Sequence, residues 1–143
     1  QISRCSYRPV TQRQMLEGEV KLNLEDELER CRPWLEAALE YSGGTHVFDD
    51  IVAGIRSGSL QLWPAKKGCI VTEIVCYPKL KKLNVFLGGG NLEQILDMDS
   101  SVISFAKDNG CKSLTMTGRK GWIKPLLSDG WTNPYFVYEK DFE

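Results

Sequence analysis

The chain has 143 residues, of which 42% are hydrophobic and 26% charged, a balance typical of a single globular domain. Lys and Arg number 18 against 19 Asp and Glu, and the formal net charge of -1 argues against general nucleic-acid binding, which needs a basic surplus. No run approaches the roughly 20 apolar residues that span a bilayer, and no signal-peptide pattern opens the chain, so we expect no membrane partner.

Residues that bind metals or form disulfides are few. Cysteine occurs at five positions, none of them in a CxxC pair, and His46 is the single histidine. This odd number without paired ligands predicts neither a zinc site nor a disulfide framework. Three cysteines fall in or beside apolar runs, where cysteine acts as a small apolar side chain: Cys69, Cys76 and Cys111. We therefore expect the reducing environment of the cytoplasm.

Along the chain, an N-terminal arm is followed by a helix. Residues 1–22 show no sustained period, so an ordered arm and a flexible tail both stay open, and residues 23–143 form the predicted domain. Apolar residues recur at helical spacing over 24–39, behind Asn23 as the N-cap. Pro33 predicts a kink or a restart within this helix.

A second, shorter helix is expected after the pair Gly43-Gly44. Thr45 is the predicted N-cap, and Gly58 is the predicted stop. The apolar residues between them recur at helical spacing and form the predicted core face: Phe48, Ile51, Val52 and Ile55.

Three strands are predicted next, over residues 60–63, 69–77 and 83–87. The second is apolar on both faces, as a central strand is. The connections between the strands are short enough for antiparallel hairpins. The third strand runs directly into Gly88-Gly89-Gly90-Asn91, which we expect to be a turn into a helix.

The remainder alternates helices and strands. Residues 91–109 are expected as one helix, or as two helices that meet near Met98, and residues 114–116 as a short strand. A short helix between Gly118 and Gly130 and a last strand over 131–142 complete the chain. This order predicts an α/β fold with a mixed, mostly antiparallel sheet and helices on both faces.

The triple glycine is the most informative motif. Glycines between a strand and a helix let the backbone approach a ligand closely, and free N–H groups at a helix start bind phosphates. The alternative is a permissive turn without a ligand. A Walker loop is excluded because Asn91-Leu92 follows the glycines, and a Rossmann loop because three hairpin-connected strands precede them.

With the glycine turn in this position, the order of elements from about Leu24 to Phe142 resembles the GNAT N-acetyltransferase superfamily, whose mixed sheet splays near the coenzyme loop. The segments LWPAKKGCIVTEIVCYP, LNVFLGGGNLEQIL, FAKDNGC and TGRKGWIKPLLSDGW resemble small GNAT-like proteins of tailed bacteriophages and prophages. The resemblance implies acetyl-CoA as co-substrate. It implies that pantetheine pairs with the main chain of Val85, Phe86 and Leu87, and that the pyrophosphate binds backbone groups of Gly88, Gly89, Gly90, Asn91 and Leu92.

Further candidate residues follow from side-chain chemistry. Arg119 and Lys120 could contact the adenosine 3′-phosphate or could cap the sheet. Glu73 lies among apolar residues and is either the base that takes a proton from the amine or a structural carboxylate. Many family members carry a general-acid tyrosine where this chain has Leu126. Tyr135 and Tyr138 are the candidates to replace it, against the alternative of buried tyrosines with satisfied hydroxyls.

Two functional hypotheses stay open. The first is an acetyl-CoA-binding N-acetyltransferase that transfers an acetyl group to an amine-bearing acceptor in the cytoplasm. The second is a catalytically silent GNAT-fold protein of a phage, with a structural role in the virion or a host protein as partner. The second is favoured by Leu126 and by the absence of the family's leading polar loop residue before Gly88.

Overall fold

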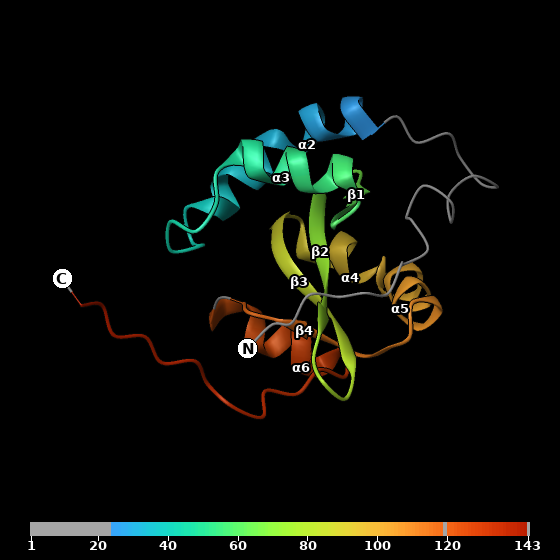
Figure 1. The fold of residues 1–143 in the computed structure, drawn as a ribbon, viewed down its shortest axis with the longest axis vertical. Coiled ribbons are helices and arrows are strands. Elements are labelled where there is room, and N and C mark those ends of the chain that lie inside the picture. Colours follow the sequence, from blue (N-terminus) through green and yellow to red (C-terminus); the bar gives the residue numbers. More distant parts are fainter. Residues whose placement is uncertain (1–23, 119, 143) are drawn as a thin grey trace.

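Four strands form one sheet in their sequence order. β1 (Leu60–Ala65), β2 (Gly68–Cys76) and β3 (Lys81–Gly90) are antiparallel, and β4 (Cys111–Met116) pairs parallel with β3. The computed structural model describes residues 24–118 and 120–142. Helices cover both faces of the sheet, as Figure 1 shows. The predicted mixed sheet with helices on both faces is therefore confirmed.

One face of the sheet is covered by α2 (Leu24–Leu39) and α3 (Phe48–Ser57). Alternate residues of a strand point to the same face, and Cys69, Val71 and Leu87 face these helices. They pack against Leu35 and Ile51, both fully buried. Each large apolar side chain buried in this way contributes roughly 1.5–3 kcal/mol to folding.

The opposite face packs against α4 (Leu92–Leu96) and α5 (Asp99–Asp108). Trp63 meets Phe105 edge to face, with ring centroids 5.5 Å apart. The Trp63 indole N–H also donates to Thr72 Oγ1 at 3.0 Å, and the Thr72 hydroxyl donates to Gln61 Oε1 at 2.7 Å. This buried chain of hydrogen bonds satisfies polar groups that would otherwise destabilise the core.

The first two helices differ from the sequence prediction in detail. α2 runs unbroken through Pro33, so the predicted restart is wrong, and Asn23 lies outside the described residues. The N-cap of α3 is Val47, whose N–H donates to Asp50 Oδ2 at 2.9 Å. Thr45 was the expected cap, but its hydroxyl donates to the Ser42 carbonyl.

The glycine segment also differs from its prediction. Gly88, Gly89 and Gly90 belong to β3 and lie opposite Ile70, Cys69 and Gly68 of β2. The turn itself is confined to Gly90 and Asn91, because only Gly90 has the positive φ, at 95°. After it, the alternative of two helices is confirmed: α4 and α5 are separate elements that meet at Met98.

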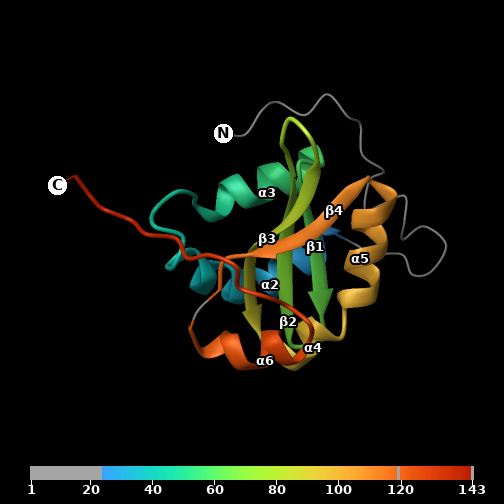
Figure 2. The same cartoon turned by 90° about the horizontal axis from the view of Figure 1, so that it is seen from below.

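The predicted last strand over 131–142 is wrong. After η1 (Lys120–Trp122) and α6 (Ile123–Ser128), this segment has no regular structure. Trp131 at its start packs against the core, and the chain then runs away from the domain (Figure 2). Tyr135 and Tyr138 are 69% and 90% exposed. A strand-like composition yields a strand only where a neighbouring strand pairs with it, and no described strand does so here.

The cysteines divide into two kinds. Cys31, Cys69 and Cys111 are free thiols, and the first two are fully buried, as expected of small apolar side chains. Cys76 is buried, as expected of a small apolar side chain, but it is disulfide-bonded, whereas the sequence predicted no disulfide framework. Within the part of the chain that the structure describes, no helix is long and apolar enough to cross a membrane.

A substitution at Gly89 tests the close approach of β3 to α2. A Cβ at this position would lie 2.8 Å from the Trp34 carbonyl oxygen, which belongs to helix backbone and has little freedom to move. We expect Gly89→Ala to lower the free energy of unfolding by about 1–3 kcal/mol in urea denaturation. Gly121→Ala is the control, because a Cβ there meets nothing within 4 Å. Equal stability of the two variants would contradict this explanation.

Candidate functional site

The pairing of β3 with its two neighbours changes at one point. β3 pairs with β4 from Lys81 as far as Val85, which lies opposite Met116, and the described strands leave residues 86–90 unpaired on that side. On its other side, β3 stays paired with β2 to Gly90, but Phe86 has no partner there and forms a bulge. We call the β4-side backbone edge of residues 86–90 the free edge of β3. It offers unpaired main-chain groups beside the glycines.

Close packing requires glycine at two of the three glycine positions on this edge. A Cβ at Gly89 would collide with Trp34, and one at Gly90 with the backbone of Lys67 and Gly68. At Gly88 a Cβ would lie 3.3 Å from Ile70 Cγ2 and 3.5 Å from the Trp122 ring, a tight but less severe contact. Packing therefore explains Gly89 and Gly90 without any ligand, and Gly88 remains the position where the sequence argument for close approach applies.

Part of the predicted phosphate-binding backbone is already used. The Asn91 N–H donates to the Lys67 carbonyl at 2.8 Å, and the Asn91 side chain accepts from the Gln94 N–H at 3.0 Å. The N–H groups of Leu92 and Glu93, in the first turn of α4, have no intrahelical partner. Of the helix-start N–H groups proposed for the pyrophosphate, that of Asn91 is thus already used within the protein, whereas that of Leu92 has no partner inside the helix.

The ring of Trp122 packs beside the free edge at Gly88. Its ring lies against the Cβ positions of both Gly88 and Gly118, at 3.5 and 3.2 Å. The neighbouring cations that were predicted to contact the 3′-phosphate or cap the sheet are Arg119 and Lys120. Arg119 lies outside the described residues, and the side chain of Lys120 is not described either. Of the segment 118–122, the ring of Trp122 is therefore the described side chain that contacts this edge.

Glu73 lies in a hydrogen-bonded row across three strands. The Asn84 side-chain amide donates to Glu73 Oε2 at 3.3 Å, and the Thr115 hydroxyl donates to Asn84 Oδ1 at 3.0 Å. Glu73 is half-buried on the face that α2 and α3 cover, and Asn84 lies two residues before Phe86. This row fits the structural alternative for Glu73 and also holds its carboxylate near the start of the free edge.

His46 lies over the bulge, a position that sequence analysis did not foresee. Its ring centroid is 4.7 Å from that of Phe86, in an edge-on arrangement with an interplanar angle of 68°. Its Nδ1 is 2.7 Å from Thr45 Oγ1. No local pattern links residues 46 and 86. The one indication of this contact in the sequence is that the single histidine lies in the loop between the two helices that cover this face of the sheet.

The two candidate tyrosines lie elsewhere. Tyr135 and Tyr138 belong to the irregular C-terminal segment, and no hydrogen bond or ring contact of the described residues joins either to the free edge. Leu126, at the family's acid position, lies in α6 and is half-buried. Its carbonyl accepts the Trp131 N–H at 3.0 Å, which closes the C-terminal end of α6.

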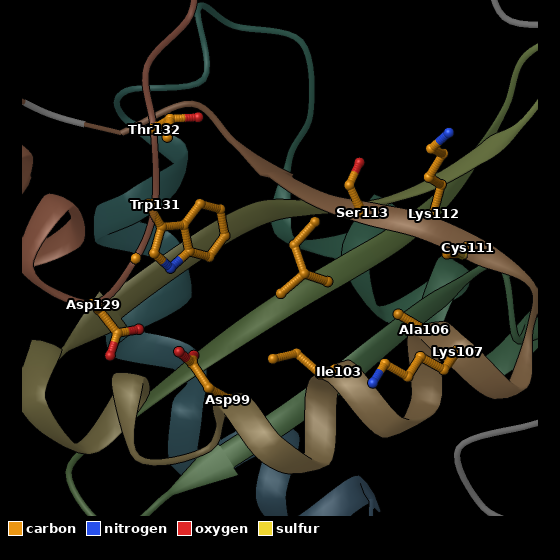
Figure 3. Close-up of a pocket in the computed structure, with 12 residues that line it drawn as sticks. Asp99, Ile103, Ala106, Lys107, Cys111, Lys112, Ser113, Asp129, Trp131 and Thr132 are labelled. Atoms are coloured by element: carbon orange, nitrogen blue, oxygen red, sulfur yellow. The ribbon is translucent and has the colours of Figure 1, made fainter.

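A cavity of about 370 Å³ lies away from the free edge, between α5, β4 and the segment after α6 (Figure 3). None of its lining residues is among the predicted coenzyme-binding positions. At one end, Asp99 and Asp129 turn their carboxyl groups toward one another. The pKa of Asp99 is raised to about 7, first by burial, then by the hydrogen bond to Asp129 and by the charges of Asp129 and Asp97.

Comparison with known proteins gives the fold and no family. No family model matches the chain, and no curated protein matches it. Among solved structures, the fold is similar to TTHA1254 from Thermus thermophilus, with a TM-score of 0.59 and 16% identity over 83% of this chain and 93% of that chain. A point mutant of TTHA1254 gives the same TM-score and identity, covering 92% of its chain. The likeness supports the α/β fold with a four-stranded mixed sheet.

The carboxyl pair predicts a pH dependence of stability. The folded pKa of Asp99, about 7, exceeds its ordinary value of 3.8, so between these pH values the folded state binds more protons than the unfolded state. This stabilisation is complete below about pH 4 and is lost as pH rises through 7. Asp129→Asn removes the like charge, and we expect it to raise the free energy of unfolding at pH 8 by on the order of 1 kcal/mol, since solvent screens this partly exposed pair.

Urea denaturation at pH 4.5 and pH 8 measures this effect. The gain of Asp129→Asn over the unsubstituted protein should be present at pH 8 and small at pH 4.5. Asp141→Asn, in the exposed C-terminal segment, is the matched control and should show no such pH dependence. A gain of equal size at both pH values would contradict the shared proton.

Proposed function

We propose that the protein binds acetyl-CoA along the free edge of β3 and transfers the acetyl group to an amine. The observation that carries this proposal is the departure of β4 from β3 after Val85, at the same point as the Phe86 bulge. Two parallel strands that part beside a glycine segment leave main-chain donors and acceptors for an extended amide chain. Pantetheine is such a chain, and it would pair with the backbone of Phe86 and Leu87 as an added strand does.

The end of β3 supports the placement of the pyrophosphate. Gly88 is half-buried and carries no side chain over its backbone, and the Leu92 and Glu93 N–H groups point out of the first turn of α4. α4 has only five residues, so its dipole contributes less than that of a long helix. Binding would therefore depend on direct hydrogen bonds from the backbone, with Arg119 and Lys120 as the proposed partners of the 3′-phosphate.

The proposed reaction is direct attack of the amine nitrogen on the thioester carbon. The C–N bond forms, the C–S bond breaks, the amine loses one proton, and the coenzyme thiolate gains one. Backbone N–H groups at the bulge would stabilise the oxyanion of the tetrahedral intermediate. Two side chains near the bulge could take the amine proton: His46, over Phe86, and Glu73, held by Asn84.

A second candidate function is a GNAT-fold interaction protein of a phage without catalysis. Two observations favour it. The half-buried Leu126 supplies no proton for the thiolate, and Tyr135 and Tyr138 lie exposed on the C-terminal segment without a contact to the free edge among the described residues. The same exposed segment carries Phe136 and Val137, an apolar surface suited to a host or virion protein.

Titration with acetyl-CoA tests the binding site. We expect binding by calorimetry, and Gly88→Asp should weaken it about tenfold or more, because a carboxylate beside the pyrophosphate repels it. Gly88→Ala is the control for the added Cβ, and thermal melting of both variants checks the fold. No heat of binding at millimolar acetyl-CoA would contradict the proposal. Binding without thiol release, across a mixture of amines, would favour the second candidate function.

The two candidate bases are separated by substitution. A general base typically accelerates a reaction about 10²–10⁴-fold. Substitution of the residue that acts as the base should therefore lower kcat about 100-fold or more and leave the affinity for acetyl-CoA unchanged. We expect this loss for His46→Gln, since His46 contacts the bulge residue directly, and a smaller one for Glu73→Gln. The pH dependence of the thiol-release rate tests the same assignment, because it reports the pKa of the group that acts as the base. A full rate in His46→Gln would exclude His46 as the base.

A further inference from the structure

The cavity beside α5 has opposite charges at its two ends. Asp99 and Asp129 lie at one end, and Lys107 and Lys112 lie toward the other (Figure 3). Along α5, residues 99 and 107 are separated by roughly 12 Å, at about 1.5 Å per residue. No ion pair of the described residues includes any of these four side chains. Charges of both signs thus line one cavity without neutralising one another.

Apolar side chains line much of the wall between the charged ends. Ile103 and Ala106 of α5 and Leu114 of β4 line it. Trp131 lines the cavity near the carboxyl end, and its indole lies beside the two carboxyl groups in Figure 3. An indole face and a carboxylate are the two groups that proteins use to hold organic ammonium ions. A volume of about 370 Å³ is at the lower end of the range for ligand sites and suits a small molecule.

We infer that this cavity binds a small zwitterion, with its ammonium group between Asp99 and Asp129. The apolar chain of the ligand lies along Ile103, and its acidic group lies near Lys107 and Lys112. The ammonium group takes the place of the proton that the two carboxyl groups share, which removes the repulsion between them. The inference is independent of the acetyl-CoA proposal, because no lining residue belongs to the free edge of β3.

Binding is expected to depend on pH in a defined direction. Asp99 has its pKa raised to about 7, and the charged groups that act on it are Asp129 and Asp97. Lys107 lies two turns further along the same helix. Below pH 7 the ammonium ion must displace a proton, so its affinity rises from pH 5.5 to pH 8.5, and the protein releases protons on binding only at the lower pH.

The experiment is calorimetric titration of the full chain with three probes of matched length: 6-aminohexanoate, hexylamine and hexanoate. We expect 6-aminohexanoate to bind most tightly, hexylamine more weakly, and hexanoate weakest of the three. At pH 6, 6-aminohexanoate should release protons, measured by repeating the titration in buffers of different ionisation enthalpy. Hexanoate binding as tightly as hexylamine would overturn the carboxyl-end assignment, and equal affinity for 6-aminohexanoate and hexylamine would overturn the lysine-end assignment.

Substitutions in the cavity, each with a matched control outside it, test whether the probe binds there. Asp129→Asn should weaken 6-aminohexanoate about tenfold or more and reduce the proton release at pH 6, whereas Asp141→Asn should change neither. Lys112→Gln should weaken 6-aminohexanoate but leave hexylamine unchanged, with Lys124→Gln on α6 as its control. Asp129 and Lys112 are exposed, so both variants should fold, and thermal melting verifies this. Unchanged affinity in both Asp129→Asn and Lys112→Gln would overturn the inference.

Discussion

The backbone of β3 meets the backbone of α2 at Gly89, and much of the architecture depends on this close approach. A side chain at residue 89 would collide with the Trp34 carbonyl, so only glycine lets the helix settle on the strand. With α2 at this depth, Leu35 and Cys31 reach the sheet and form the first core with Val71 and Leu87. The loop after α2 then passes over β3, which brings His46 onto Phe86.

This contact changes the interpretation of the three glycines, Gly88, Gly89 and Gly90. In the sequence, three glycines after a strand indicate a phosphate-binding turn, because nothing else in the local pattern requires them. In the structure they extend β3, and close packing accounts for Gly89 and Gly90. The support for a coenzyme therefore moves from the glycines to the strand edge beside them, where β4 departs after Val85 and Phe86 bulges. A register pattern of this kind has no signature in composition or spacing.

What the sequence predicted correctly was local. Helical spacing located α2 and α3, short connections gave the antiparallel hairpins, and Gly58 ends α3 with a positive φ of 86°. The errors came from competition between equivalent groups or from distant contacts. Thr45 and Asp50 both offer an oxygen to the start of α3, and the structure uses Asp50. The pairs His46–Phe86 and Asp99–Asp129 join residues far apart in the chain, so no periodicity could reveal them.

The two candidate sites share one element, β4. Its last residue opposite β3, Met116, marks where the free edge begins, and its first four residues, from Cys111 to Leu114, line the cavity. A ligand in the cavity would touch β4, α5 and the segment after α6 at once, and it would stabilise the folded state by binding it alone. Coupling between the sites would require β4 to move as a unit, because they lie at its opposite ends and share no side chain. The parallel pairing of residues 81–85 with β4 opposes such a movement, so the geometry favours two sites that bind independently.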